Sequence, residues 1–376
     1  MRFLPLLLLL LIAAAPVQAH QLPEKFTGFE DPASCAGCHE KIYREWEGSM
    51  HAKSSKFADP VHSAVFDTFS KAMAAAGKPA GYFCANCHMP TAGNIARLMS
   101  GEAAPDPADE SHVRGITCSF CHKADGLVEG ERFNSCRMTE GIKGKGGSDA
   151  PHGSVKSEFA TTFAVCLGCH GKMVNAKGAV ICSVDEEGYS DCLACHMPDA
   201  EGAPAAGSAR LAHASHALHG ARDAESLKKG AGVELGREMG RLLVLLKNPN
   251  PHYFPSTNPM RVAYVKVEIT DAGGKTLFVN FAKDPSEDPK ALFIKVFKAG
   301  DKVGAPTWEA DGVAKDSRLK GGETRAIAYD IPDGAARATA GLYYRFVPPA
   351  AMEKFGIKPD GVVEAEYLVS EAELAL

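Results

Sequence analysis

Hydrophobic and polar residues alternate along the last third of the chain. Val265, Val267 and Ile269 alternate with polar neighbours, and further strand-like segments follow at 276–282, 291–298, 324–331, 341–347 and 362–369. A period of two is typical of β-strands with one buried face, and turns rich in Gly, Pro and Asp separate these segments. We therefore predict that residues 255–376 form an all-β antiparallel sandwich of immunoglobulin-like type. The segment 233–247 fits either a helix or a first strand.

The N-terminus carries a different hydrophobic pattern. A basic start at Met1-Arg2 precedes the run Phe3–Ala15, which is apolar apart from Pro5, and small residues follow before Ala19. This pattern is typical of a secretory signal peptide at residues 1–19. A membrane anchor is the weaker interpretation, because the run has about 13 residues and a spanning helix needs about 20. We expect an exported mature chain beginning at His20 with no membrane span, located in the periplasm or at the cell exterior.

The stretch between these two patterns is rich in short helical and loop signals. Gly, Pro, Ala and Asp cluster at 101–110, 142–150 and 198–209, which predicts surface loops. We expect residues 20–222 to form a mostly α-helical and irregular domain, joined to the β-sandwich by a linker at 223–254.

Composition excludes one class of partner and singles out one residue type. The 376 residues are 45% hydrophobic with a formal net charge of -5, and no basic block is present, which argues against a nucleic-acid partner. Twelve cysteines, however, are many for an ordinary globular chain. Their meaning depends on their spacing.

Ten cysteines form five C-x-x-C pairs, and a histidine directly follows each pair. The motifs are CAGCH, CANCH, CSFCH, CLGCH and CLACH, with the cysteines Cys35, Cys38, Cys84, Cys87, Cys118, Cys121, Cys166, Cys169, Cys192 and Cys195 and the histidines His39, His88, His122, His170 and His196. Two thiols at this spacing can bind the vinyl groups of one porphyrin, and the adjacent imidazole then reaches the iron. The sequence therefore predicts five covalently attached haem c groups.

Zinc and disulfide interpretations explain this pattern less well. Zinc sites built from C-x-x-C use two pairs per metal and need no histidine after each pair, so five identical motifs fit poorly. A disulfide scaffold would not place ten cysteines in the same five-residue frame.

The second axial ligand decides whether a haem iron carries electrons or binds a small molecule. Nine histidines lie outside the motifs, which is enough to close all five sites. They are His20, His51, His62, His112, His152, His213, His216, His219 and His252. Met89 and Met197 directly follow motif histidines and cannot reach the opposite face of the same ring.

Several segments together resemble multihaem cytochromes related to cytochrome c-554 and hydroxylamine oxidoreductase. The likeness rests on CAGCHEKIYREWEGSMH, HVRGITCSFCH, CLACHMP, SHALHG and PHYFPS, and runs from about Cys35 to about Tyr344. It implies that His51, His112, His152, His216 and His252 are the distal ligands. The match at SHALHG is looser, so His219 is an alternative to His216. His252 falls at the seam between the two predicted domains, so we expect the β domain to lend a ligand to a haem of the other domain.

Two cysteines remain outside the motifs, Cys136 and Cys182. In an oxidising compartment such a pair favours one disulfide, and two buried free thiols are the alternative.

These features predict an exported pentahaem c-type cytochrome that relays electrons through bis-histidine haems to redox proteins of the cell envelope. We name no catalytic residue. One alternative is a multihaem oxidoreductase with one open haem that acts on a nitrogen oxide or hydroxylamine. The other is a subunit of an extracellular cytochrome filament or other homo-oligomer.

Overall fold

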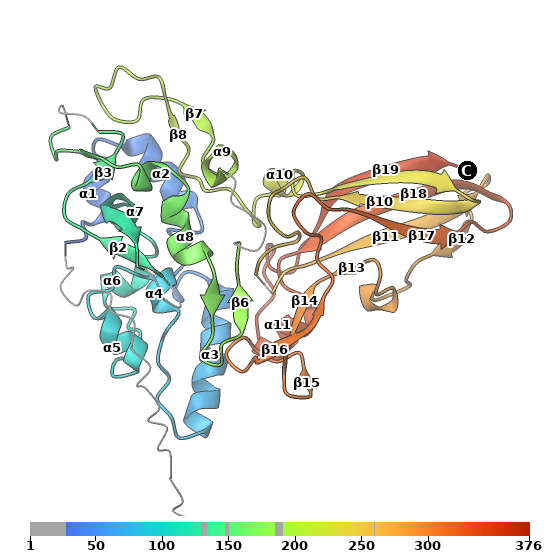
Figure 1. Ribbon diagram of the computed structural model, residues 1–376, viewed down its shortest axis with the longest axis horizontal. Helices are drawn as coiled ribbons and strands as arrows, with labels where there is room; N and C mark the ends of the chain where they lie inside the picture. Colours follow the sequence, from blue (N-terminus) through green and yellow to red (C-terminus); the bar gives the residue numbers. More distant parts are fainter. Residues whose placement is uncertain (1–27, 129–133, 147–149, 185–190, 259) are drawn as a thin grey trace, which may run out of the picture.

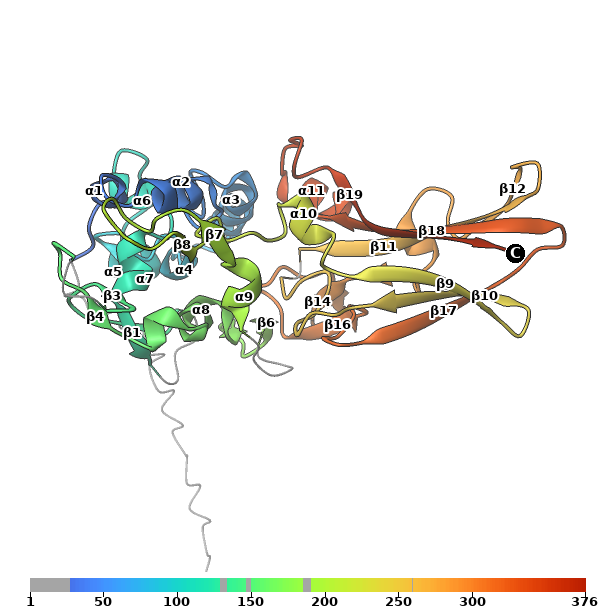
Figure 2. The ribbon, with the colours of Figure 1, turned by 90° about the horizontal axis from the view of Figure 1, so that it is seen from above.

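The computed structural model describes residues 28–128, 134–146, 150–184, 191–258 and 260–376. The predicted signal peptide and His20 lie outside these residues. An N-terminal part made of short helices and hairpins lies beside a C-terminal part made of long antiparallel strands (Figures 1 and 2). No helix in the described ranges is long and apolar enough to cross a membrane.

Short helices dominate the N-terminal part. They are α1 (Pro32–Ala36), α2 (Glu40–Gly48), α3 (Pro60–Ala75), α4 (Ala85–His88), α5 (Ile95–Ser100), α6 (Glu110–Val113), α7 (Cys118–Lys123), α8 (Ala164–His170), α9 (Cys192–His196) and α10 (Ala224–Leu227). Polar N-caps explain where several begin. Asp59 accepts the N–H groups of Val61 and His62 at the start of α3, and Thr117 accepts that of Phe120 at the start of α7.

Four small two-stranded pairings connect these helices. They are β1 (Ala124–Leu127) with β2 (Cys136–Met138), β3 (Lys143–Gly144) with β4 (Val155–Lys156), β5 (Met173–Val174) with β6 (Val180–Cys182), and β7 (Asp199–Glu201) with β8 (Ala212–Ala214). Hydrophobic packing among the described N-terminal residues is divided into two small clusters, one around Phe66 and Tyr82 and one around Phe120 and Met138. Side chains alone therefore give this part little core of its own.

The C-terminal part contains two main antiparallel sheets. The first has the order β17 (Thr324–Asp330), β10 (Arg241–Lys247), β9 (Gly232–Glu238). The second has the order β12 (Thr276–Val279), β11 (Val262–Asp271), β18 (Ala335–Arg345), β19 (Glu366–Ala375), with β13 (Leu292–Phe293) also pairing with β11. Smaller elements are β14 (Lys295–Ala299), β15 (Lys302–Val303), β16 (Gly312–Asp316) and α11 (Pro349–Phe355).

The two main sheets share one hydrophobic core. Leu242, Val244 and Leu246 alternate along β10 and are fully buried, in the same cluster as Ile269 of β11 and Leu342 of β18. Figure 2 shows the two layers, with β11, β18 and β19 on one side and β9, β10 and β17 on the other. The predicted C-terminal part rich in antiparallel strands is thus present, and the immunoglobulin-like arrangement stays a prediction.

The segment 233–247, which the pattern left open, forms the β9–β10 hairpin. Every residue of β10 from Arg241 to Lys247 pairs with both β9 and β17. Strand pairing therefore starts at Gly232, inside the stretch 223–254 that was predicted as a linker. The boundaries of the predicted domains stay a prediction. The predicted strand 291–298 is divided into β13 and β14.

The core of the C-terminal part should be sensitive to the loss of a single side chain. Leu342 of β18 is fully buried, whereas Leu368 on the neighbouring strand β19 is 40% exposed. We expect Leu342→Ala to lower the free energy of unfolding by about 2–5 kcal/mol, through lost burial and the cavity left behind. Leu368→Ala is the matched control and should cost less than about 1 kcal/mol. Denaturant unfolding measures both, and equal losses would contradict the layered core.

Candidate haem sites

The attachment motifs lie on short helical turns. α7 and α9 begin at the first cysteine of their motifs, whereas α4 and α8 end at the motif histidine. Residues three and four apart lie on the same side of a helical turn. The two thiols and the imidazole of each motif can therefore face one haem from a single turn of chain.

Four of the five motif histidines have their Nδ1 atoms against backbone carbonyls. His39 contacts Pro204 O at 2.6 Å, His122 contacts Lys143 O at 2.7 Å, His196 contacts His219 O at 2.6 Å and His88 contacts Ser54 O at 3.0 Å. A carbonyl only accepts, so Nδ1 must donate its proton. The lone pair then lies on Nε2, which is the arrangement that a metal-binding imidazole needs.

Four motif histidines also face a second histidine ring across a gap of nearly constant width. The ring centroids are 6.2 Å apart for His39 and His152, 6.1 Å for His170 and His51, 6.3 Å for His122 and His216, and 6.5 Å for His196 and His252. With metal–nitrogen bonds of about 2 Å, two imidazoles on opposite sides of one metal have centroids about 6.3 Å apart. All four gaps fit a single iron between the two rings.

The second rings are oriented by the same kind of hydrogen bond as the motif rings. His216 Nδ1 donates to Ala214 O at 2.8 Å and His152 Nδ1 donates to Gly153 O at 2.6 Å. His252 Nδ1 lies 3.2 Å from Tyr253 O. Burial lowers the pKa of His51 to about 3 and that of His216 to about 4. His51 and His216 are therefore neutral at ordinary pH, which is the state that binds a metal.

His112, predicted as the fifth distal ligand, lies elsewhere. Its Nδ1 accepts the backbone N–H of Asp106 at 3.0 Å, and its Nε2 lies 2.7 Å from Asn94 Oδ1. Both ring nitrogens are used inside the protein, and the ring is buried. This arrangement leaves no lone pair for a metal, and the role of His112 as a distal ligand stays a prediction.

The ring beside His88 is that of His62, and the gap is too narrow for an iron. Their centroids are 4.1 Å apart. His62 Nδ1 lies 3.0 Å from Ser54 O, and its Nε2 lies 3.1 Å from the hydroxyl of Tyr82. Within the described part of the chain, no histidine ring faces His88 at the separation found in the other four pairs.

Glu45 of α2 supports one of the distal rings and was missed by the sequence analysis. Its Oε2 accepts the backbone N–H of His216 at 2.8 Å, and its Oε1 lies 3.0 Å from Nε2 of His213. Nδ1 of His213 lies 2.9 Å from Gly202 O. The carboxylate therefore holds the segment that carries His216, directly after β8. A glutamate in the middle of an ordinary helix gives no signal of this role.

The segment 198–209, predicted as a surface loop, also supports two sites. It contains Pro204, whose carbonyl holds His39, and β7, which pairs with β8 directly before His216. Ala206 N additionally donates to Cys38 O at 2.7 Å. The loop therefore contacts the first motif, at Cys38 and His39. Through the β7–β8 pairing it also supports the segment before His216, the ring that faces His122 of the third motif.

Asn248 fixes the position of His252. Its side-chain nitrogen donates to His252 O at 2.8 Å and to Lys320 O at 2.8 Å. Phe254 and Leu319 form an isolated bridge next to it. The ring that faces His196 is thus anchored to the loop between β16 and β17.

Neighbouring thiols indicate which motifs lie side by side. A hydrogen bond from Cys118 lowers the pKa of Cys35, and one from Cys87 raises the pKa of Cys169. Burial, followed by the charges of Cys192 and Cys121, raises the pKa of Cys166 to about 12. The first motif therefore adjoins the third, the second adjoins the fourth, and the fourth also lies near the third and fifth.

The predicted Cys136–Cys182 disulfide is not formed in this structure. Both thiols are free, with Cys136 Sγ 3.6 Å from Val165 O and Cys182 Sγ 3.4 Å from Thr257 Oγ1. Cys136 packs instead against the fourth motif, where a Cβ added at Gly168 would lie 2.1 Å from its sulfur. The glycine of CLGCH is therefore needed for this contact.

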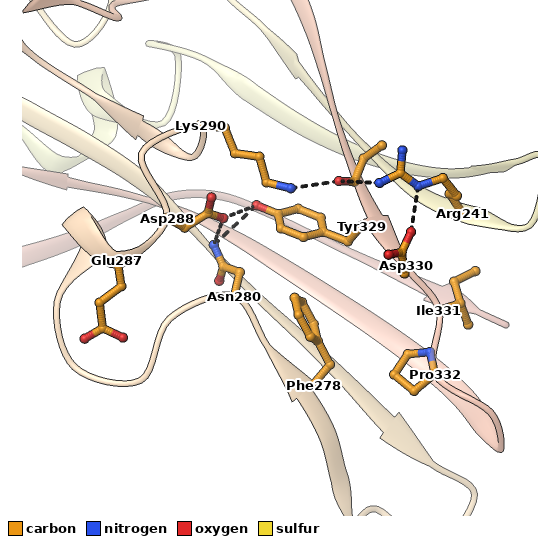
Figure 3. Close-up of a pocket in the computed structure, with 11 residues that line it drawn as sticks. Arg241, Phe278, Asn280, Glu287, Asp288, Lys290, Tyr329, Asp330, Ile331 and Pro332 are labelled. Atoms are coloured by element: carbon orange, nitrogen blue, oxygen red, sulfur yellow. Dashed lines mark hydrogen bonds and ion pairs between the residues drawn. The ribbon is translucent and has the colours of Figure 1, made fainter.

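A cavity of about 480 Å³ lies far from the motifs, in the C-terminal part. Its polar groups are satisfied by one another. The Tyr329 hydroxyl donates to Asp288 at 2.6 Å, Asn280 bonds the same carboxylate, and Arg241 pairs with Asp330 at 2.9 Å (Figure 3). This cavity has the character of a structural network and adds nothing to the candidate haem sites.

Comparison with known proteins supports a multihaem c-type cytochrome. The family model described as cytochrome c554 and c-prime matches residues 34–123. A penta-heme cytochrome c552 from Thermochromatium tepidum has a similar solved structure, with 26% sequence identity, a TM-score of 0.76, and coverage of 92% of this chain and 99% of that chain. No curated protein matches the chain significantly.

Gly115 should be essential to the placement of His51. A Cβ added there would lie 2.2 Å from His51 O and 2.6 Å from Ala52 O, so Gly115→Ala must displace the segment that carries the partner ring of His170. We expect Gly115→Ala to convert part of one iron in the holoprotein to the high-spin form, measured by electron paramagnetic resonance. Gly93→Ala is the control, since its nearest atom lies at 4.0 Å. An unchanged spectrum in Gly115→Ala would contradict this packing.

Proposed function

We propose that this chain, which is a multihaem c-type cytochrome, relays electrons in the cell envelope through five covalently attached haem c groups, four of them with two histidine ligands. The observation that carries the proposal is the set of four imidazole pairs with centroids 6.1–6.5 Å apart. Bound haem supplies reversible one-electron chemistry at its iron, and two histidines leave no position for substrate.

The chain's own residues hold each pair in place. The proposed ligand pairs are His39 with His152, His122 with His216, His170 with His51, and His196 with His252. Backbone carbonyls take the Nδ1 protons of most of these rings. Burial lowers the pKa values of His51, His122, His170 and His216, which favours the neutral, metal-binding form of these rings. Two histidine ligands on each iron would leave its ligation little changed between the two oxidation states. Low reorganisation of this kind suits electron transfer rather than catalysis.

The order of the motifs in space supports a branched path. The adjacency of the thiols supports an arrangement with the first site beside the third, the third beside the fourth, and the fourth beside both the second and the fifth. An electron entering at the first site can therefore reach the fourth through the third. The fourth site then leads either to the second site or to the fifth, which borders the β-rich part.

Export and partners follow from the sequence pattern. The signal-peptide pattern at residues 1–19 and the covalent attachment of haem both suit a location outside the cytoplasm, in the periplasm or at the cell exterior. We propose redox proteins of the cell envelope as partners. A filament or other homo-oligomer remains the alternative form of assembly.

One observation favours a second candidate function, in which the haem beside His88 is open to a small molecule. His88 has its Nδ1 held by Ser54 O like the other motif histidines. In the described residues it lacks the opposing ring, because His62 is too close and His112 is engaged elsewhere. A single open iron would allow reduction of a nitrogen oxide with electrons delivered by the other four haems, or oxidation of hydroxylamine with electrons passed on to them.

The ligand assignment predicts opposite results for two histidine variants. His216→Ala should leave one of the five irons with a single protein ligand, which electron paramagnetic resonance detects as one additional high-spin iron per chain. His112→Ala is the control and should leave the spin count unchanged, since both of its ring nitrogens are bonded to protein groups. The assignment fails if His112→Ala, and not His216→Ala, adds the high-spin signal.

Carbon monoxide tests the open haem. We expect the reduced wild-type protein to bind about one carbon monoxide per five haems, measured by optical titration, because a bis-histidine iron does not bind it. The double variant Cys84→Ala, Cys87→Ala should lose one haem together with this binding. The matched variant Cys118→Ala, Cys121→Ala should lose one haem and keep it. Absence of binding in the wild type would exclude the second function and leave the electron relay in place.

A further inference from the structure

His62 is a buried histidine that belongs to none of the four proposed ligand pairs. It lies in the first turn of α3, where Asp59 accepts the backbone N–H groups of Val61 and His62 at 3.0 and 3.4 Å. Its ring packs against that of His88 of the second motif, with the centroids 4.1 Å apart and the ring planes at 53°. A side chain in this place can act on an iron through His88.

The two histidines donate to one backbone carbonyl. Nδ1 of His62 and Nδ1 of His88 each lie 3.0 Å from Ser54 O. A carbonyl only accepts, so both rings carry their proton on Nδ1. Two N–H dipoles aimed at one oxygen repel each other, which weakens both bonds. The first, third and fifth motif histidines lie closer to their own carbonyls, at 2.6–2.7 Å.

Tyr82 makes His62 a stronger donor. Its hydroxyl lies 3.1 Å from Nε2 of His62, and because Nδ1 holds the ring proton, the hydroxyl donates and Nε2 accepts. Hydrogen bonds in such a chain polarise one another, so the Tyr82 hydroxyl strengthens the bond from His62 to Ser54 O. Burial lowers the pKa of His62 well below its ordinary value, and the neutral ring keeps the chain in this direction.

The shared carbonyl is held in place from its own residue and the next. The Ser54 hydroxyl lies 2.7 Å from the carbonyl of His88 and 2.9 Å from that of His51. Ser55 Oγ donates to Val113 O at 2.8 Å, and both serines are buried. The sharing of Ser54 O is therefore built into the fold of this segment.

We propose that His62 is a positioning residue that raises the midpoint potential of the haem at the second motif by competing with His88 for the Ser54 carbonyl. The proposal rests on the proposed function in one respect, that a haem is attached at Cys84 and Cys87. A strong hydrogen bond from Nδ1 raises the basicity of a metal-binding imidazole, which stabilises the oxidised iron. His62 weakens that bond and so favours the reduced iron.

The test is potentiometric titration of the holoprotein. His62→Phe keeps a ring against His88 but donates nothing to Ser54 O, so the midpoint potential of one haem should fall while the other four stay unchanged. His62→Asn should restore most of the wild-type value, because its amide nitrogen can take the place of Nδ1. Tyr82→Phe should lower the same potential by a smaller amount, since it removes only the donor that strengthens His62.

Phe66→Leu is the matched control. Phe66 is buried, and its ring lies 4.1 Å from that of Tyr82, so the change disturbs the same packing without removing a bond to the shared carbonyl. It should leave all five potentials unchanged. An equal fall in Phe66→Leu would assign the effect to packing and overturn the proposal, as would an unchanged or raised potential in His62→Phe.

Deletion of the second attachment site identifies the haem that responds. In the background Cys84→Ala, Cys87→Ala, adding His62→Phe should leave the potentials of the remaining haems unchanged. A fall that persists in this background belongs to another haem and overturns the proposal. Haem content is measured before each titration. Fewer than five haems in the wild type would be a failure of the proposed function, whereas five haems with no response to His62→Phe would be a failure of this proposal alone.

Discussion

Two imidazole rings can share one iron only when they stand about 6.3 Å apart, and this spacing governs the N-terminal part of the chain. Each ring of a pair comes from a distant segment, as with His39 and His152 or His122 and His216. The backbone must bring these segments to a fixed separation without a core of side chains between them. Short helices and hairpins meet this need, and hydrogen bonds from ring Nδ1 atoms to backbone carbonyls hold the rings in place.

The segment from His51 to Ser55 illustrates how little chain is needed for this. His51 faces His170, and its carbonyl accepts the backbone N–H of Ile116 at 2.8 Å. Three residues later, the Ser54 carbonyl accepts from both His62 and His88. Two neighbouring sites, the second and the fourth, thus share one short support, which agrees with the adjacency of Cys87 and Cys169.

Much of this could be predicted from the sequence, because covalent attachment demands a fixed motif. The five motifs, the β-rich C-terminal part and four of the rings that face motif histidines were all named from residues or from resemblance. The packing of Gly115 and the backbone N–H of Ile116 against the His51 carbonyl could not be predicted, because both contacts are made by backbone atoms. Glu45 and Pro204 were missed, because a carboxylate or carbonyl that orients a ring is defined by the fold and leaves no local pattern.

The anchoring of His252 has a consequence for the order of assembly. The first four sites can draw their residues from the chain before position 217, but the ring opposite His196 is held by Asn248, which also needs the carbonyls of Leu319 and Lys320. Under the proposed pairing of His196 with His252, the fifth iron would acquire its second histidine only after the loop between β16 and β17 has folded. The spin state of this iron would then distinguish a fully folded chain from one whose C-terminal part is still unfolded.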